Sequence, residues 1–191
     1  ENTIAATKGR SICAFHTDGT DLVQTPGLID RPADLDYQRA QVTVRTLLNP
    51  ATTLTVNART YAEDRGNGTP LQRNASHEAF LSATLAGTPA NDGAGPTAWS
   101  ATLYGQTQSF SAFFTAVNAA RTAETPANNQ YDVPATAGGG AFIATWAHDP
   151  DATTTAGADA RRVTGETRED YPWSVPLNQF TRRRFLHGAG V

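Results

Sequence analysis

Apolar and polar side chains alternate along much of the chain. Residues 37–47 follow this pattern, and it resumes over residues 54–59. The apolar positions are Ala40, Val42 and Val44, then Leu54, Val56 and Ala58, and the polar positions between them include Gln41, Thr43, Arg45, Thr55, Asn57 and Arg59. A period of two predicts β-strands. Asn49-Pro50 separates the two runs and predicts a tight turn, because proline donates no hydrogen bond to a strand ladder.

Later segments repeat the alternation and predict further strands. These runs begin at Ala79, Trp99, Phe142 and Ala156. Phe80 interrupts the first run. The second run either continues to Val117, which is long for a soluble sheet, or bends at Gly105. Since helical periodicity is hard to find, we predict an all-β fold, an antiparallel up-and-down meander of about seven or eight strands.

The connections between the expected strands differ in length. Turns near Asn49, Asp92 and Asp149 are expected to be short, and the connections over residues 17–35, 63–73, 118–139 and 168–181 are expected to be long. Short and long connections alternate, so the meander has two different ends. This asymmetry is typical of outer-membrane barrels, which have short periplasmic turns and long external loops. We therefore predict that residues 1–191 are a segment of a transmembrane β-barrel.

Composition and charge narrow the function. The chain has 191 residues, a formal net charge of −3 and 17% charged residues, so no strongly basic nucleic-acid binder is expected. No apolar run is long enough for a transmembrane helix. One cysteine permits neither an intrachain disulfide nor a cysteine zinc cage. Arg45, Arg59, Glu78, Asp159 and Arg161 fall opposite the apolar positions, as in a polar barrel lumen with paired charges.

Candidate chemistry is sparse. Cys13 and His16 lie three positions apart, which places them on opposite faces of a strand. No nucleophile elbow is present, so we predict no enzyme, no catalytic residues and no cofactor. Aspartates gather around the first long connection and near a later turn, at Asp18, Asp21, Asp30, Asp34, Asp36, Asp149 and Asp151. Without EF-hand spacing, turn chemistry is favoured over a calcium site, and no metal is expected.

Three segments resemble TonB-dependent outer-membrane receptors. Residues 61–74, YAEDRGNGTPLQRN, resemble an external loop of that family, and the flanking LTVNARTYAE and ASHEAFLSATLAG resemble its strand pair. Residues 109–134 are similar to the next long external connection, and residues 156–170 to a strand that runs up into its loop. The resemblance covers most of residues 37–184. It lies in the alternation pattern and in short stretches of sequence.

The resemblance implies a plugged barrel of about 22 strands. This chain would then be one partial barrel domain, with no plug and no signal peptide. Its function would be uptake of a small ligand, such as an iron chelate, vitamin or sugar, across the cell outer membrane. The expected partners are outer-membrane lipid, the TonB system through missing N-terminal parts, and the small-molecule ligand, with no nucleic acid.

The most family-like loop supplies the candidate ligand-binding residues. They are Arg65, Asn67, Arg73 and Asn74. Arginine forks pair well with carboxylates, so this set suits an anionic ligand. The alternative is that these side chains only hold the loop in place.

Two other functions remain open. A soluble all-β ligand- or carbohydrate-binding module would gather its aromatic side chains in one cleft. A structural or adhesive surface protein would need internal repeats, and no fixed repeat period is present. Trp99 and Trp146 lie at the short-turn ends of their strands, which favours the aromatic girdle of a membrane barrel.

Overall fold

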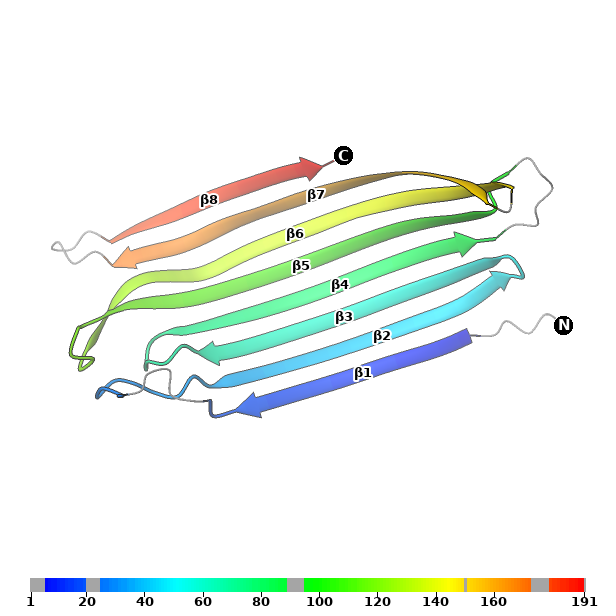
Figure 1. The fold of residues 1–191 in the computed structure, drawn as a ribbon. Coiled ribbons are helices and arrows are strands. Elements are labelled where there is room, and N and C mark those ends of the chain that lie inside the picture. Colours follow the sequence, from blue (N-terminus) through cyan, green and yellow to red (C-terminus); the bar gives the residue numbers. More distant parts are fainter. Residues whose placement is uncertain (1–5, 20–24, 89–94, 150, 173–178, 191) are drawn as a thin grey trace.

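The computed structural model describes residues 6–19, 25–88, 95–149, 151–172 and 179–190. These residues form one antiparallel sheet in which each strand pairs with the next along the chain (Figure 1). The strands are β1 (Ala6–Thr17), β2 (Leu35–Asn49), β3 (Thr52–Gly66), β4 (Arg73–Gly87), β5 (Ala98–Val117), β6 (Glu124–Asp149), β7 (Ala152–Pro172) and β8 (Gln179–Gly190). The all-β, up-and-down meander predicted from the alternation is confirmed.

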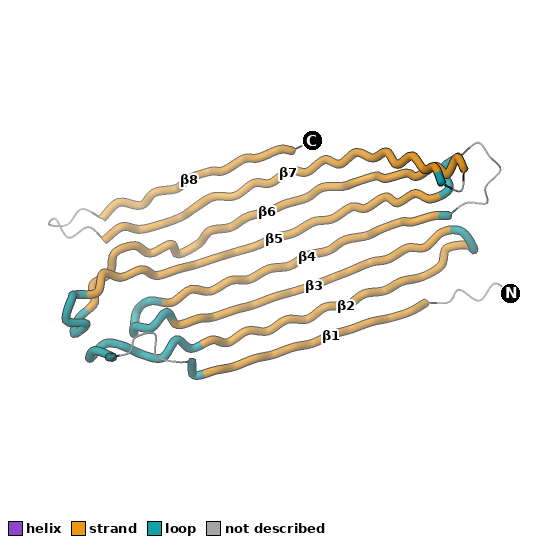
Figure 2. Tube along the Cα trace, viewed as in Figure 1, coloured by secondary structure: helices purple, strands orange, loops and turns teal. Residues whose placement is uncertain are grey.

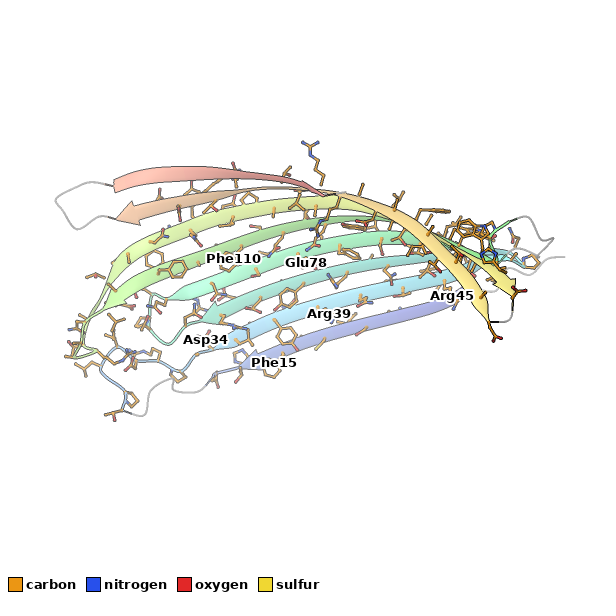
Figure 3. The ribbon with its side chains drawn as sticks, turned by 45° about the horizontal axis from the view of Figure 1, so that its top comes forward. Phe15, Asp34, Arg39, Arg45, Glu78 and Phe110 are labelled. Carbon is orange, nitrogen blue, oxygen red and sulfur yellow. The ribbon has the colours of Figure 1, made fainter. Side chains whose placement is uncertain are left out.

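The sheet is open. Its order runs from β1 at one edge to β8 at the other, and the described residues of these two strands do not pair with each other. The described residues form strands, turns and loops but no helix (Figure 2). Within them, no helix long and apolar enough to cross a membrane is found. The sheet is curved, and it stands as a single layer (Figure 3).

The expected alternation of short and long connections is wrong in detail. The connection between β5 and β6 spans only residues 118–123, because β6 begins at Glu124. The connection between β4 and β5 spans residues 88–97 and is longer than the β3–β4 loop of residues 67–72. Gly105 does not bend β5, since it stays in register with Leu81 and Gly138. The expected long connection over residues 118–139 is short because backbone pairing extends into its second part, although the composition of that part is typical of a loop.

Register shifts allow β6 to be so long. Its pairing with β5 slips between Phe110 and Ala112 and again between Phe114 and Thr115. Pro126 pairs at the second slip, where a missing N–H costs the ladder least. Pro134 stays paired with Ser109 without a shift, so the segment continues the sheet although its proline and glycine content is typical of a loop.

Directly paired residues share a face, so the register defines two faces. The polar face contains the row Arg39, Tyr61, Glu78 and Gln108, and the neighbouring rows that begin with Ser11 and Phe15. The apolar face contains Ile12, Val42, Leu81, Leu103 and Phe142, whose exposed fractions are 83%, 46%, 57%, 71% and 49%. The sequence alternation thus sorts side chains onto the two sides of one sheet.

A hydrophobic core is nearly missing from the described part of the chain. The only apolar residues buried there are Ala112 and Ala144. Hydrophobic stabilisation scales with the apolar area removed from water, and a single layer removes little. The apolar face therefore requires a further layer or another apolar environment that shields it from water.

Two tryptophans lie on the apolar face near the end that carries the β2–β3 and β6–β7 turns. Trp99 pairs with Ala144 and with Gly87, and Trp146 lies two residues further along the same side of β6. A Cβ added at Gly87 would come within 2.5 Å of Trp99 Nε1, so the indole lies directly over this glycine. Lys8 and Arg10 are cations on the same face, at edge strand β1.

Candidate functional site

The four candidate residues of the family-like loop do not share one face. Arg65 pairs with Asn74 on the polar face, whereas Arg73 pairs with Gly66 on the opposite face. Asn67 Nδ2 donates a hydrogen bond of 2.7 Å to Asn74 Oδ1, so these two side chains are brought together. Arg65 Nε lies 3.3 Å from Glu63 Oε1. The two arginines therefore do not form a common anion-binding fork.

Arg73 is already paired with two carboxylates. Its Nη2 lies 2.6 Å from Asp64 Oδ1 and 3.1 Å from Asp34 Oδ2. The hydrogen bond to Asp64, with the further contribution of Asp34, raises the pKa of Arg73 above its ordinary value. In this arrangement Arg73 links the β1–β2 connection to the start of β4.

A second ion pair joins distant loops. Arg121 Nε donates to both carboxylate oxygens of Asp30, at 2.9 and 2.8 Å, and the Gly27 amide donates to Asp30 Oδ2 at 2.6 Å. The Asp30 side chain is only 4% exposed. The hydrogen bonds from Arg121 and from Gly27 lower the pKa of Asp30 to about 2. Arg121 has a φ of 52°, so the turn that presents it is left-handed.

Glu124 gathers donors from three segments. Thr69 Oγ1 and Thr115 Oγ1 donate to its Oε2 at 2.7 and 2.8 Å, and the Leu71 amide donates to Oε1 at 2.9 Å. Burial raises the pKa of Glu124, but these hydrogen bonds outweigh it, so the pKa lies below its ordinary value. We call residues 25–34, 67–72 and 118–123 the loop cluster, because Asp30, Arg73 and Glu124 connect them or their flanking strands.

The aspartates of the first long connection are engaged in these contacts. Asp30 and Asp34 pair with arginines, and His16 lies 2.7 Å from Asp36 and 3.2 Å from Asp18. The described stretches contain no group of three or more His, Cys, Asp or Glu side chains placed to hold a metal ion. Asp21 lies outside the described residues.

The polar face carries a groove of about 370 Å³ across β1 to β4. It is lined by Ser11, Cys13, Tyr37, Arg39, Arg59, Tyr61 and Glu78. A row of aromatic rings runs across the strands beside it: Phe15 and Tyr37 have centroids 5.5 Å apart, and Tyr37 and Tyr61 have centroids 6.1 Å apart. Figure 3 shows Phe15, Arg39 and Glu78 on their strands within this part of the sheet.

Two of the three charged groups in the groove neutralise each other. Arg59 donates to Glu78 Oε1 from Nε at 3.1 Å and from Nη2 at 2.5 Å. The Arg59 guanidinium also lies 5.0 Å from the centroid of Phe80, which stacks on Tyr104. Phe80, which interrupts the alternation of its strand, thus has a packing role on the polar face.

Arg39 is the remaining cation of the groove. Its Nη2 donates to Gln41 Oε1 at 2.7 Å, and no carboxylate in the described part of the chain pairs with it. The side chain is exposed. Sequence reasoning missed this site. The signal was the Tyr37-x-Arg39 and Arg59-x-Tyr61 spacing on strands joined by a tight turn, which places all four residues on one face.

The expected separation of Cys13 and His16 is confirmed. Cys13 pairs with Arg39 on the polar face, and its Sγ lies 3.7 Å from Tyr37 Oη. His16 pairs with Asp36 on the opposite face. The two side chains therefore lie on opposite faces and do not form a common site.

No protein-family model matches the chain, and no curated protein or solved structure is significantly similar to it.

Proposed function

We propose that this chain is part of the wall of an outer-membrane β-barrel, a TonB-dependent receptor that takes up a small ligand. One observation carries the proposal: in the long strands β2 to β5 of a single-layered sheet, most aliphatic side chains lie on one face, and most charged and hydroxyl side chains lie on the other. In water, the apolar face would leave a large contiguous apolar surface exposed to solvent, which is unfavourable. Lipid against that face would remove its apolar side chains from water, and an aqueous lumen against the other face would hydrate its polar side chains.

The dimensions of the apolar face suit a bilayer. On β4, apolar-face positions run from Ala79 to Gly87, about 27 Å along an antiparallel strand. A strand tilted by about 40° would place them across roughly 20 Å, close to the ~25 Å apolar band of membrane barrels. Trp99 and Trp146 lie at the turn end of this band, where an aromatic girdle is expected. Lys8 and Arg10 are exceptions to this match, because they lie inside the band, in the rows of Ala83 and Leu81, where a charge disfavours lipid contact.

The opposite end of the sheet suits the external mouth of such a barrel. There the loop cluster is held by charged and hydroxyl groups, at Asp30, Arg73 and Glu124. Binding residues are disproportionately carried by loops on a rigid scaffold. The groove around Arg39 opens on the polar face, which becomes the lumen in this proposal.

A soluble all-β module is the second candidate, and the aromatic row of Phe15, Tyr37 and Tyr61 favours it. That module would need a second layer over the apolar face. The two candidates differ in their behaviour with lipid: the barrel wall should remain with phospholipid vesicles after an alkaline carbonate wash, whereas a soluble module should be released.

The receptor itself is tested by the reading frame on both sides of residues 1–191. We expect a plug-forming domain upstream, and further alternating strands downstream that close the barrel. A reading frame that encodes this sheet alone would contradict the receptor and leave at most a membrane-associated sheet.

A further inference from the structure

We propose that the groove on the polar face is a binding subsite for a small organic anion, with its carboxylate on Arg39 and its flat body beside Tyr37 and Tyr61. The inference deepens the proposed function, because it names the class of ligand that the lumen would take. It also moves the expected anion contact from the loop arginines to the wall of the sheet.

The charge of the groove supports an anionic ligand. Arg59 and Glu78 form a close pair, so the charges lining the groove sum to +1, that of Arg39. The nearest carboxylate further along the same face of β3 is Glu63, which already accepts from the Tyr61 hydroxyl and pairs with Arg65. A guanidinium presents several donors in a fixed fork that matches a carboxylate. Arg39 gives one of these to Gln41 and retains the others.

The loop arginines are less suited to this role. Arg73 already pairs with Asp34 and Asp64, and Arg121 with Asp30. An anion that bound there would have to displace a carboxylate of the protein. Arg39 has no such competitor among the described residues, because its side-chain partner is a neutral amide.

The groove also offers surface for a flat apolar body. Its volume of about 370 Å³ is near the lower end of the range of ~300–1,000 Å³ for small-molecule pockets. Tyr37 and Tyr61 supply aromatic surface beside the guanidinium, with ring centroids 6.1 Å apart. An anion of the size of benzoate can place its carboxylate on Arg39 and its ring beside Tyr37 and Tyr61.

The test is a binding titration of the full chain with benzoate, and with neutral benzamide as the matched probe, followed by NMR shifts of labelled arginine side chains. We expect saturable binding of benzoate that perturbs Arg39, and much weaker binding of benzamide. Arg39→Gln should lower benzoate affinity about tenfold to a hundredfold, the usual range for a lost charge-assisted contact. Arg39→Lys should lose part of that affinity, because the charge remains without the fork.

Arg45→Gln is the matched control. Arg45 lies on the same strand and the same face, but lines a separate depression near the β2–β3 turn. We expect its affinity for benzoate to equal that of the unmodified chain. Equal losses in the two variants, or equal binding of benzamide, would overturn the subsite. Vesicle binding without benzoate binding refutes only the subsite, and benzoate binding without vesicle binding refutes only the barrel wall.

Discussion

Replacement of Glu124 by alanine should loosen the whole loop cluster. The carboxylate accepts hydrogen bonds from Thr69, Thr115 and the Leu71 amide. Thr69 is only 6% exposed, so Glu124→Ala leaves its buried hydroxyl without this acceptor. An unsatisfied buried polar group costs about 1–3 kcal/mol. We expect the free energy of opening residues 67–72 to fall by that amount.

Hydrogen–deuterium exchange measures this change at single amides. A loss of about 1–3 kcal/mol corresponds to exchange about 5- to 150-fold faster. The informative amide is that of Asn67, which donates to the Gln72 carbonyl at 2.8 Å and does not contact Glu124. Faster exchange there reports that the loop opens as a unit. Glu124→Gln is the control, because it retains an acceptor oxygen and should lose less protection.

Unchanged exchange at Asn67 in Glu124→Ala would contradict this role of Glu124. It would mean that the loop is held by its own backbone hydrogen bonds and not by the strand beside it. Faster exchange confined to the Leu71 amide would point the same way, since that amide loses its acceptor directly.

Asp30, Leu103 and Gly87 each offer one further test. Because the pKa of Asp30 is lowered from 3.8 to about 2, its contribution to loop closure should be fully present above pH 3.8 and lost as the pH falls through about 2, measured by NMR. Leu103→Lys should weaken vesicle binding by about 2–4 kcal/mol, whereas Gln106→Lys on the polar face of the same strand should not, measured by flotation. Gly87→Ala should displace the Trp99 indole and destabilise the sheet by about 1–3 kcal/mol, measured by tryptophan fluorescence during unfolding.

The strands β2 to β7 were predictable from sequence, because side chains in them alternate with a period of two. Val42, Leu81 and Leu103 are all placed on one face by that pattern, and pairing confirms it. The length of β6 was not predictable. Pro126, Pro134 and the glycines near residue 139 indicate a loop, but a register shift lies at Pro126, and pairing continues through Pro134 and the glycines. The composition of a segment does not predict whether its backbone pairs with a neighbouring strand.

The contacts of the candidate site were harder to predict than the strands. The pairing of Arg73 with Asp34 joins residues far apart in sequence, and a single sequence without a register gives no sign of it. The Arg39 groove depends on which residue of β3 lies opposite β2, because Arg59 and Tyr61 line it only in the observed register. A slip by one residue would turn these side chains to the other face.

In the proposed barrel wall, the face of the sheet that carries Leu103 contacts lipid. Spin labels at Leu103→Cys and Gln106→Cys, each in a Cys13→Ser background, test it in phospholipid vesicles. We expect the label at position 103 to collide mainly with lipid-soluble oxygen, and the label at position 106 to collide mainly with a water-soluble nickel chelate. Equal access of the nickel chelate to both positions would contradict the proposed lipid contact, because the apolar face would then lie in water.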